Sequence, residues 1–236
     1  MSKIIAIAGL TPGSGKTTVS LNLAASLSIY EKKNLVVDFD SNSEVSNQLK
    51  AGITENKVVF ERLYPFTDFI PSGFEESSFF KNIAGVCSKT EKVFEIFIKS
   101  LSKEYEFVIL DIPSKMDFLS TSALAVCEDV IIVNKSNEFN LKAIQRLLLT
   151  IFQINKRFKK KINIKGILTW GHSIPLESSL KPWPADLNNH IFKVFIPYEN
   201  IMDNNEKFQT PFCFNDILSP ASISYLEFCR ELWREL

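Results

Sequence analysis

A glycine-rich segment directly follows an apolar run near the N-terminus, and it limits the possible folds more than any other part of the chain. Residues 4–8 read IIAIA, residues 9–18 read GLTPGSGKTT, and apolar residues at roughly helical spacing follow them. A buried strand, a glycine-rich turn and a helix in this order form the setting of a phosphate-binding loop. The backbone amides of such a turn and the positive end of the helix bind an anion. The segment therefore predicts an α/β fold with a site for nucleotide phosphates.

The side chains of this segment suit ATP with Mg²⁺. Lys16 would bring positive charge to the β- and γ-phosphates and pack against nothing else, Thr17 would place its hydroxyl on Mg²⁺, and Thr18 would contact the α-phosphate. The rest of the loop is expected to surround the phosphates with its backbone: Thr11, Pro12, Gly13, Ser14 and Gly15.

The segment departs from the usual pattern G-x-x-x-x-G-K-[ST] at its first glycine. That position holds Leu10, and Gly9 stands one residue out of register. A glycine-rich turn without a ligand is the alternative interpretation. The GSGKTT core, with a strand before it and a helix after it, favours the phosphate site.

Composition sets limits on the function classes. Lys and Arg number 27, as do Asp and Glu, so the chain has no net charge with which to attract nucleic acid or an acidic membrane. Any such binding needs a local patch. We expect neither a membrane span nor a signal peptide, and four scattered cysteines without a C-x-x-C pair are typical of free thiols in a cytoplasmic protein.

Apolar runs alternate with helical patterns along the whole chain. The runs cover residues 4–8, 34–38, 66–70, 107–111, 129–134, 164–169 and 192–196, and helices are expected over 88–105 and about 140–158. Continuous Val, Ile and Leu runs separated by helices indicate a parallel sheet covered on both faces. We therefore expect a doubly wound, mostly parallel sheet flanked by helices, in a single domain over residues 1–236.

Three aspartates follow predicted strands. Asp38 and Asp40 end the strand after the loop helix, and Asp111 ends the run FVIL. Ligands of such sheets bind beyond the carboxyl ends of the strands, where the glycine-rich loop also lies. An aspartate at a strand end also caps a following helix, which is the structural alternative. Three acids at one edge favour a role at a metal ion and at a reacting water.

The chain resembles the ParA/MinD family of P-loop ATPases, also called the deviant Walker A family, over nearly all its length. The segment TPGSGKTT matches the family's K-G-G-x-G-K-[ST]-T in spacing. The segments VVDFD and FVILDIPS resemble its two acidic motifs, and KVFIPYENIMDNNE resembles its strand, Ile-Pro and short helix near the base. Residues from TPFCFN onward resemble the C-terminal tail of ParA.

This resemblance implies a cytoplasmic ATPase that forms a homodimer on ATP and positions DNA or another cargo; for DNA, the expected partner is a ParB-like protein. On this basis Asp38 joins the water shell of Mg²⁺, Asp40 orients the attacking water, and Asp111 holds the metal through water. The catalytic residues are then Lys16, Asp38 and Asp40. Ile196, Pro197 and Tyr198 are expected along the adenine.

The signature lysine of the family, which crosses the dimer to the partner's phosphates, falls on Thr11. Losing a charged contact to a phosphate removes ~1.5–3 kcal/mol, a factor of roughly ten to a hundred. Nucleotide binding is expected to survive this change, whereas dimer-coupled hydrolysis is in question. Lys115 either replaces the missing charge or is simply solvated.

One dense basic cluster follows the helix over about 140–158. A charged helix end and a non-specific DNA-backbone site both explain it, and the resemblance to partition ATPases favours DNA. The cluster consists of Lys156, Arg157, Lys159, Lys160, Lys161 and Lys165.

The C-terminal segment 223–236 is amphipathic, with an expected apolar side of Leu226, Cys229, Trp233 and Leu236. A membrane-targeting helix, as in MinD, carries a basic polar face, whereas three glutamates outnumber two arginines here. A helix packed on the core is therefore expected.

Four functional hypotheses follow. The leading one is a ParA-like ATPase of plasmid or chromosome partition that is associated with the nucleoid through DNA. The alternatives are a nucleotide-gated scaffold with little hydrolysis, a MinD-like positioning ATPase, and a small-molecule kinase or synthetase of related fold.

Overall fold

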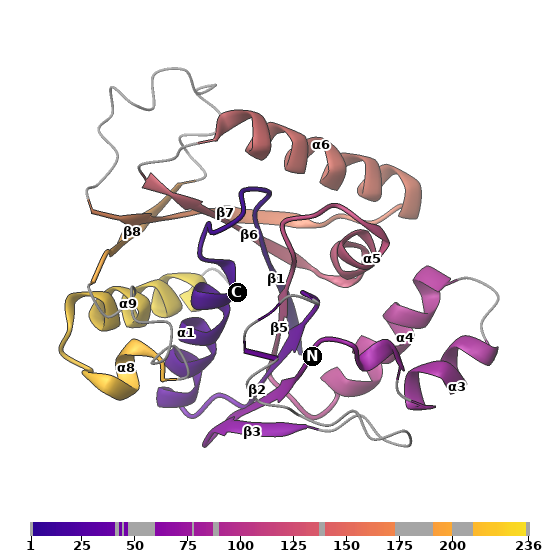
Figure 1. The fold of residues 1–236 in the computed structure, drawn as a ribbon, viewed down its shortest axis with the longest axis horizontal. Helices are drawn as coiled ribbons and strands as arrows, with labels where there is room; N and C mark the ends of the chain where they lie inside the picture. The colour runs from indigo at the N-terminus through magenta and orange to yellow at the C-terminus, as the bar shows by residue number, and fades with distance from the viewer. Residues whose placement is uncertain are drawn as a thin grey trace.

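The described part of the computed structural model forms one twisted sheet with helices on both faces (Figure 1). It comprises residues 2–40, 43, 45–46, 60–76, 78–86, 90–136, 140–172, 191–199 and 210–234. Eight strands of these residues pair in the order β3-β4-β2-β5-β1-β6-β7-β8. They are β1 (Lys3–Ala8), β2 (Asn34–Asp38), β3 (Glu61–Tyr64), β4 (Thr67–Ile70), β5 (Phe107–Asp111), β6 (Asp129–Lys135), β7 (Asn163–Gly171) and β8 (Ile191–Pro197).

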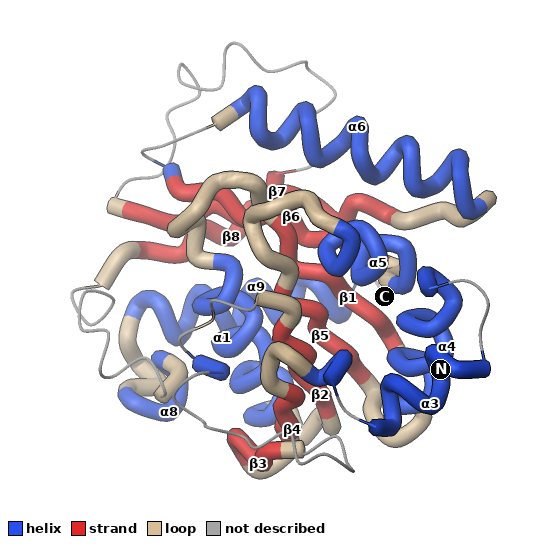
Figure 2. Tube along the Cα trace, turned by 45° about the vertical axis from the view of Figure 1, so that its right-hand side comes forward, coloured by secondary structure: helices blue, strands red, loops and turns tan. Residues whose placement is uncertain are grey.

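Every neighbouring pair of strands is parallel except β3 and β4. The helices divide between the two faces of the sheet, as Figure 2 shows. One face is covered by α1 (Lys16–Ile29), α8 (Phe212–Asn215) and α9 (Pro220–Arg234). The other is covered by α3 (Ser78–Val86), α4 (Thr90–Ser102), α5 (Phe118–Val126) and α6 (Leu141–Phe158), with the short turn η1 (Phe74–Glu76) beside α3. The predicted α/β class is confirmed.

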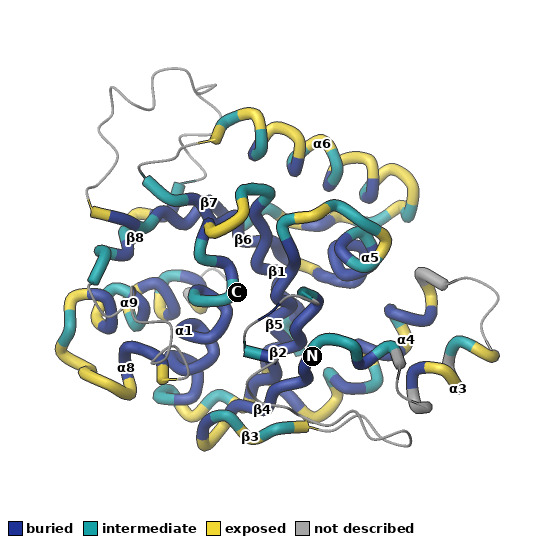
Figure 3. Tube along the Cα trace, in the orientation of Figure 1, coloured by how far each residue is buried: buried dark blue, intermediate teal, exposed yellow. Residues whose placement is uncertain are grey.

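The central strands are apolar throughout because both of their faces are buried. In β1, Ile4, Ala6 and Ala8 join the core on one side of the sheet, and Ile5 and Ile7 join the core on the other. Successive side chains of a strand point to opposite faces, so a strand between two helical layers needs apolar residues at every position. Figure 3 shows β1, β2 and β5 as buried.

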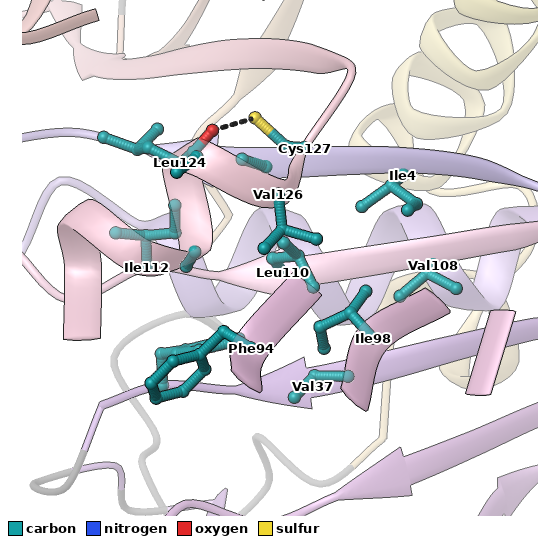
Figure 4. Packing of buried hydrophobic residues seen from close by; sticks show 14 of the residues in the cluster. Ile4, Val37, Phe94, Ile98, Val108, Leu110, Ile112, Leu124, Val126 and Cys127 are labelled. Carbon is teal, nitrogen blue, oxygen red and sulfur yellow. Dashed lines mark hydrogen bonds between the residues drawn. The ribbon is translucent and has the colours of Figure 1, made fainter. Parts of the chain in front are cut away.

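Figure 4 shows the core on the α4 side, where Phe94 and Ile98 lie over strand residues such as Val37 and Leu110. Cys127 lies in this core and donates a hydrogen bond from Sγ to the carbonyl oxygen of Leu124 at 3.2 Å. Three of the four cysteines are free and buried, as expected from their spacing: Cys127, Cys213 and Cys229. Cys87 lies outside the described residues.

The predicted strands agree with the structure to within about two residues. The sequence pattern did not predict β3, an antiparallel edge strand, or the helices α3, α5 and α8. The helix expected over 88–105 is α4, which is shorter, and residues 87–89 lie outside the described residues.

The C-terminal helix packs on the core as expected, but its apolar side was predicted only in part: Cys229 is buried and Leu226 is half-buried, whereas Trp233 is exposed. The buried apolar residues are Ala221, Tyr225, Phe228, Cys229 and Leu232, because α9 begins at Pro220 and turns these residues towards β8 and α1. Trp233 is 40% exposed, and Leu236 lies outside the described residues. No helix in the described ranges is both long and apolar enough to cross a membrane.

Candidate nucleotide-binding site

The glycine-rich segment forms a tight loop between β1 and α1. Gly13 and Gly15 adopt positive φ angles of 69° and 87°, in the left-handed region that favours glycine. Gly9 serves another purpose: a Cβ there would lie 2.9 Å from the carbonyl oxygen of Val133 and 3.1 Å from Ser14 Oγ. Gly9 thus permits a close approach to β6. Leu10, at the usual glycine position, packs partly against the core.

Lys16 lies in the loop with its ammonium group held by a side chain from another strand end. Its Nζ donates a hydrogen bond to Ser114 Oγ at 2.6 Å, and Ser114 Oγ donates to the carbonyl oxygen of Thr11 at 3.3 Å. Burial lowers the pKa of Lys16, and the charges of Asp111 and Asp40 oppose this shift. Lys16 is only 8% exposed, so the expectation that its side chain packs against nothing was wrong.

Asp38 and Asp111 lie side by side at the carboxyl edge of the sheet, at paired positions of β2 and β5. Both are buried, which raises the pKa of each carboxyl well above its usual range. The charge of Asp38 raises the pKa of Asp111 further, and a hydrogen bond from Thr17 opposes this. The structure therefore brings Lys16, Thr17, Asp38 and Asp111 together.

The donor set fits the Mg²⁺ ion that the sequence implies. Among the described residues, Asp111 Oδ1 is buried without a hydrogen-bond partner. Mg²⁺ prefers carboxylate and hydroxyl oxygens, directly or through water, and a cation offsets the repulsion between two buried carboxylates. The residues that would hold the ion are Thr17, Asp38 and Asp111.

Asp38 is fixed by groups that follow β2. Its Oδ1 accepts a hydrogen bond from the Asp40 amide at 2.8 Å, and its Oδ2 accepts one from Ser46 Oγ at 2.5 Å. Ser46 Oγ in turn accepts from the Ser72 amide at 2.9 Å. These serines had no recognisable spacing in the sequence. Because the Asp40 amide bonds to Asp38, the position of the Asp40 backbone depends on this network.

The residues expected along the adenine lie at the end of β8, on the same edge of the sheet. Tyr198 follows Pro197, donates its amide hydrogen to the Gly171 carbonyl oxygen at 2.7 Å, and packs its ring 4.0 Å from that of His172. Trp170 of β7, which pairs with Ile196 of β8, contacts the phosphate loop, and its Nε1 donates to the Ser14 carbonyl oxygen at 2.5 Å. Neither Trp170 nor Ser114 was singled out from the sequence, although Ser114 closes the quoted segment FVILDIPS.

Comparisons with known proteins agree with this arrangement. The sequence model of a family described as an AAA domain (AAA_31) matches residues 2–164, which are more than half of the chain. The chain belongs to the ParA/MinD family of P-loop ATPases. A relative over nearly the full length is the chromosome partitioning protein ParA of Myxococcus xanthus, with 22% identity over 99% of this chain and 89% of that protein.

Solved structures of the ParA/MinD fold also resemble this protein. Cobyrinic acid a,c-diamide synthase from Mycobacterium smegmatis, with bound ADP and magnesium, has a TM-score of 0.74 at 17% identity and covers 100% of this chain and 95% of that one. MinD of Aquifex aeolicus has a TM-score of 0.72 at 16% identity and covers 100% and 98%. At such identities the likeness shows the fold alone.

The position of the ParA/MinD signature lysine lies on the partly exposed side of the loop. Thr11 accepts hydrogen bonds at its carbonyl oxygen from the Ser14 amide and Ser114 Oγ, both at 3.3 Å. Lys115, the next residue after Ser114, has an exposed side chain, and its carbonyl oxygen accepts a hydrogen bond from Ser120 Oγ at 2.5 Å. Hydrogen bonds thus hold the backbone carbonyl groups of Thr11 and Lys115 in place.

The basic cluster lies away from the loop, where α6 ends and β7 begins. Lys160 Nζ donates to the Ala125 carbonyl oxygen at 2.7 Å and lies 3.7 Å from Glu95 Oε1, so this side chain contacts the fold. Lys159 ends the helix in a left-handed conformation. The exposed members are Lys156, Arg157, Lys159 and Lys161.

Proposed function

We propose that this protein is a Mg²⁺-dependent ATPase of ParA type that converts ATP and water to ADP and phosphate. The observation that carries the proposal is the meeting of Lys16 and Thr17 with Asp38 and Asp111 at the carboxyl edge of the sheet. A buried cation for the phosphates and two adjacent buried carboxylates for a metal form the parts that phosphoryl transfer requires. The single domain acts in the cytoplasm as a homodimer that assembles on ATP.

Each part of the site has a separate task in this proposal. The loop amides and Lys16 bind and orient the phosphates, and Lys16 Nζ exchanges its hydrogen bond to Ser114 Oγ for one to a phosphate oxygen. Mg²⁺, when bound, neutralises charge on the β- and γ-phosphates. Asp40 orients the attacking water. Its backbone is fixed by the hydrogen bond to Asp38, and its side chain is half-buried, so water has access to its carboxylate. Pro197 and Tyr198 line the adenine.

Thr11 points to slow hydrolysis. A hydroxyl supplies no positive charge to the γ-phosphate, whose developing charge the site must stabilise. This favours one further candidate function, a nucleotide-gated scaffold in which ATP acts mainly as the ligand that assembles the dimer.

Replacing Thr11 by lysine is expected to raise turnover roughly ten- to a hundred-fold, the gain that a charged contact to a phosphate provides. Phosphate release is measured against protein concentration, since a lysine acting across the dimer makes specific activity rise with concentration. Thr11→Ser is the matched control and should leave the rate unchanged. Fast turnover of the wild-type protein that survives Lys115→Ala would contradict the inference and remove the scaffold candidate.

We propose further that the ATP-bound dimer binds DNA without sequence preference and works in plasmid or chromosome partition with a ParB-like partner. The relative named ParA and the exposed cations Lys156, Arg157, Lys159 and Lys161 support this proposal. Contacts to the phosphate backbone need positive charge but no base-reading group. Lys160 contributes less, since it is bonded within the fold.

A variant with Lys156, Lys159 and Lys161 replaced by glutamate tests the DNA site. We expect unrelated duplexes to bind wild-type protein with similar affinity and steep salt dependence, and the triple variant to lose this binding without a change in ATP affinity. The matched control replaces three exposed cations elsewhere, Lys33, Lys92 and Lys103. Equal DNA mobility shifts for the wild type and the cluster variant would assign the cluster to a solvated helix end.

A further inference from the structure

We propose that Trp170 is a positioning residue of the phosphate-binding loop: its indole sets the orientation of the Ser14–Gly15 peptide and thereby the affinity for phosphates. The inference rests on the proposed function, because it assigns a role within the same nucleotide site. Trp170 lies on β7, two strands away from β1 in the sheet and 156 residues from Ser14 in sequence.

The contact involves both the edge and the ring of the indole. Trp170 Nε1 donates to the Ser14 carbonyl oxygen at 2.5 Å. A Cβ added to Gly15 would lie 2.8 Å from Nε1 and 3.0 Å from Cε2 of the same ring. The indole thus packs directly on the Gly15 backbone. A side chain at position 15 would clash with this ring, and the φ angle of 87° also disfavours any residue other than glycine.

The hydrogen bond has a consequence for the loop amides. The peptide between Ser14 and Gly15 is trans, so its C=O and N–H groups point in opposite directions. A carbonyl held against Trp170 directs the Gly15 N–H away from the indole, to the other side of the loop. Phosphate-binding loops bind anions through amides oriented in this way, so an interaction outside the loop determines the direction of a donor within it.

The indole itself is held by its neighbours in the sheet. Trp170 is paired with Lys135 of β6 on one side and Ile196 of β8 on the other. The Lys135 ammonium lies 5.5 Å from the centroid of the indole ring, within the range of a cation–π interaction. Trp170 is thus held between two neighbouring strands near the carboxyl end of β7. Preorganised donors cost less free energy on binding than mobile ones.

The test compares Trp170→Phe with Trp233→Phe. The first keeps an aromatic ring against Gly15 but removes the N–H donor, and the second changes a tryptophan on α9 that packs against Tyr30, away from the loop. Affinities are measured by calorimetry for Mg·ATP and for inorganic tripolyphosphate with Mg²⁺, which has no base. Loss of one hydrogen bond to the loop is expected to weaken both ligands about five- to tenfold in Trp170→Phe. Trp233→Phe should bind both as the wild type does.

The outcomes separate this inference from the proposed function. If the wild-type protein binds neither ligand, the proposed function fails and the inference fails with it. If the wild type binds both and Trp170→Phe binds tripolyphosphate equally well, the inference alone is overturned. A loss restricted to ATP would also overturn it, because Trp170 would then act on the base. Equal melting temperatures of the two variants establish that the difference is not one of folding.

A second measurement needs no substitution at position 170. In ¹⁵N-labelled wild-type protein, the indole N–H of Trp170 is expected to exchange with D₂O more slowly than that of the partly exposed Trp233. Its resonance should shift when tripolyphosphate and Mg²⁺ are added. Exchange as fast as that of Trp233, or a resonance unchanged by tripolyphosphate, would overturn the inference.

Discussion

Replacement of Lys16 by alanine is expected to weaken Mg·ATP binding by at least about a hundredfold while leaving the protein folded. Lys16 is the buried cation of the loop, and its removal deprives the phosphates of a charge-assisted contact. It also leaves the negative charges of Asp40 and Asp111 near the loop without the cation that now opposes them. Each effect is expected to cost about 1.5 kcal/mol of binding free energy. Together they cost about 3 kcal/mol, which corresponds to an affinity loss of at least about a hundredfold.

Titration calorimetry measures the affinity, and circular dichroism with thermal unfolding measures the fold. Lys92→Ala, on the exposed side of α4, is the matched control and should bind ATP as the wild type does. Among the described residues, the side-chain hydrogen bond that Lys16→Ala loses is the one to Ser114, so the fold is expected to persist. Unchanged ATP affinity in a folded Lys16→Ala protein would overturn the phosphate site.

The Asp40→Ala variant is expected to bind Mg·ATP and dimerise normally but to lose turnover by about a hundredfold or more. Orienting the attacking water affects only the hydrolysis step, and positioned acids and bases contribute factors of this order. The substitution spares the backbone contacts at this position, which are the bond from the Asp40 amide to Asp38 and the bond from the Ser43 amide to the Asp40 carbonyl oxygen.

Phosphate release under steady-state conditions gives the rate, and sedimentation with ATP gives the dimer population. Asp117→Ala serves as the control because it removes a carboxylate that caps α5. It should lower stability while turnover of the folded fraction stays near the wild-type value. A failure of Asp40→Ala to dimerise with ATP would show that Asp40 has a structural task instead.

The strand runs predicted the central sheet well for a physical reason. A strand covered on both faces requires apolar residues at consecutive positions, and β1, β2, β5 and β6 all satisfy this requirement. The edge strand β3 is half solvated and carries Glu61 and Arg62, so no apolar run identified it. Helix α9 was predicted, but its buried side was predicted only in part, with Cys229 right and Trp233 wrong, because that side depends on where the helix meets β8 and α1.

The candidate site also contains some residues that the sequence predicted and others that it did not. The loop, Lys16, Thr17 and the aspartates at the strand ends follow from local order in the chain, since parallel strands bring their carboxyl ends to one edge. The supporting groups did not follow from it. Ser46, Ser114 and Trp170 reach the site from separate segments of the chain. None of them stands at a sequence spacing that forms a recognisable motif.

The sequence by itself determined the class of fold, the phosphate-binding loop and the edge of the sheet where the acids gather, because each depends on hydrophobic period, glycine placement or strand direction. Only the tertiary structure decided which groups hold these residues in place. Lys16 meets Ser114 across 98 positions, and Ser14 meets Trp170 across 156. Such contacts depend on strand order and register, which the burial of the whole sheet selects and no short segment encodes.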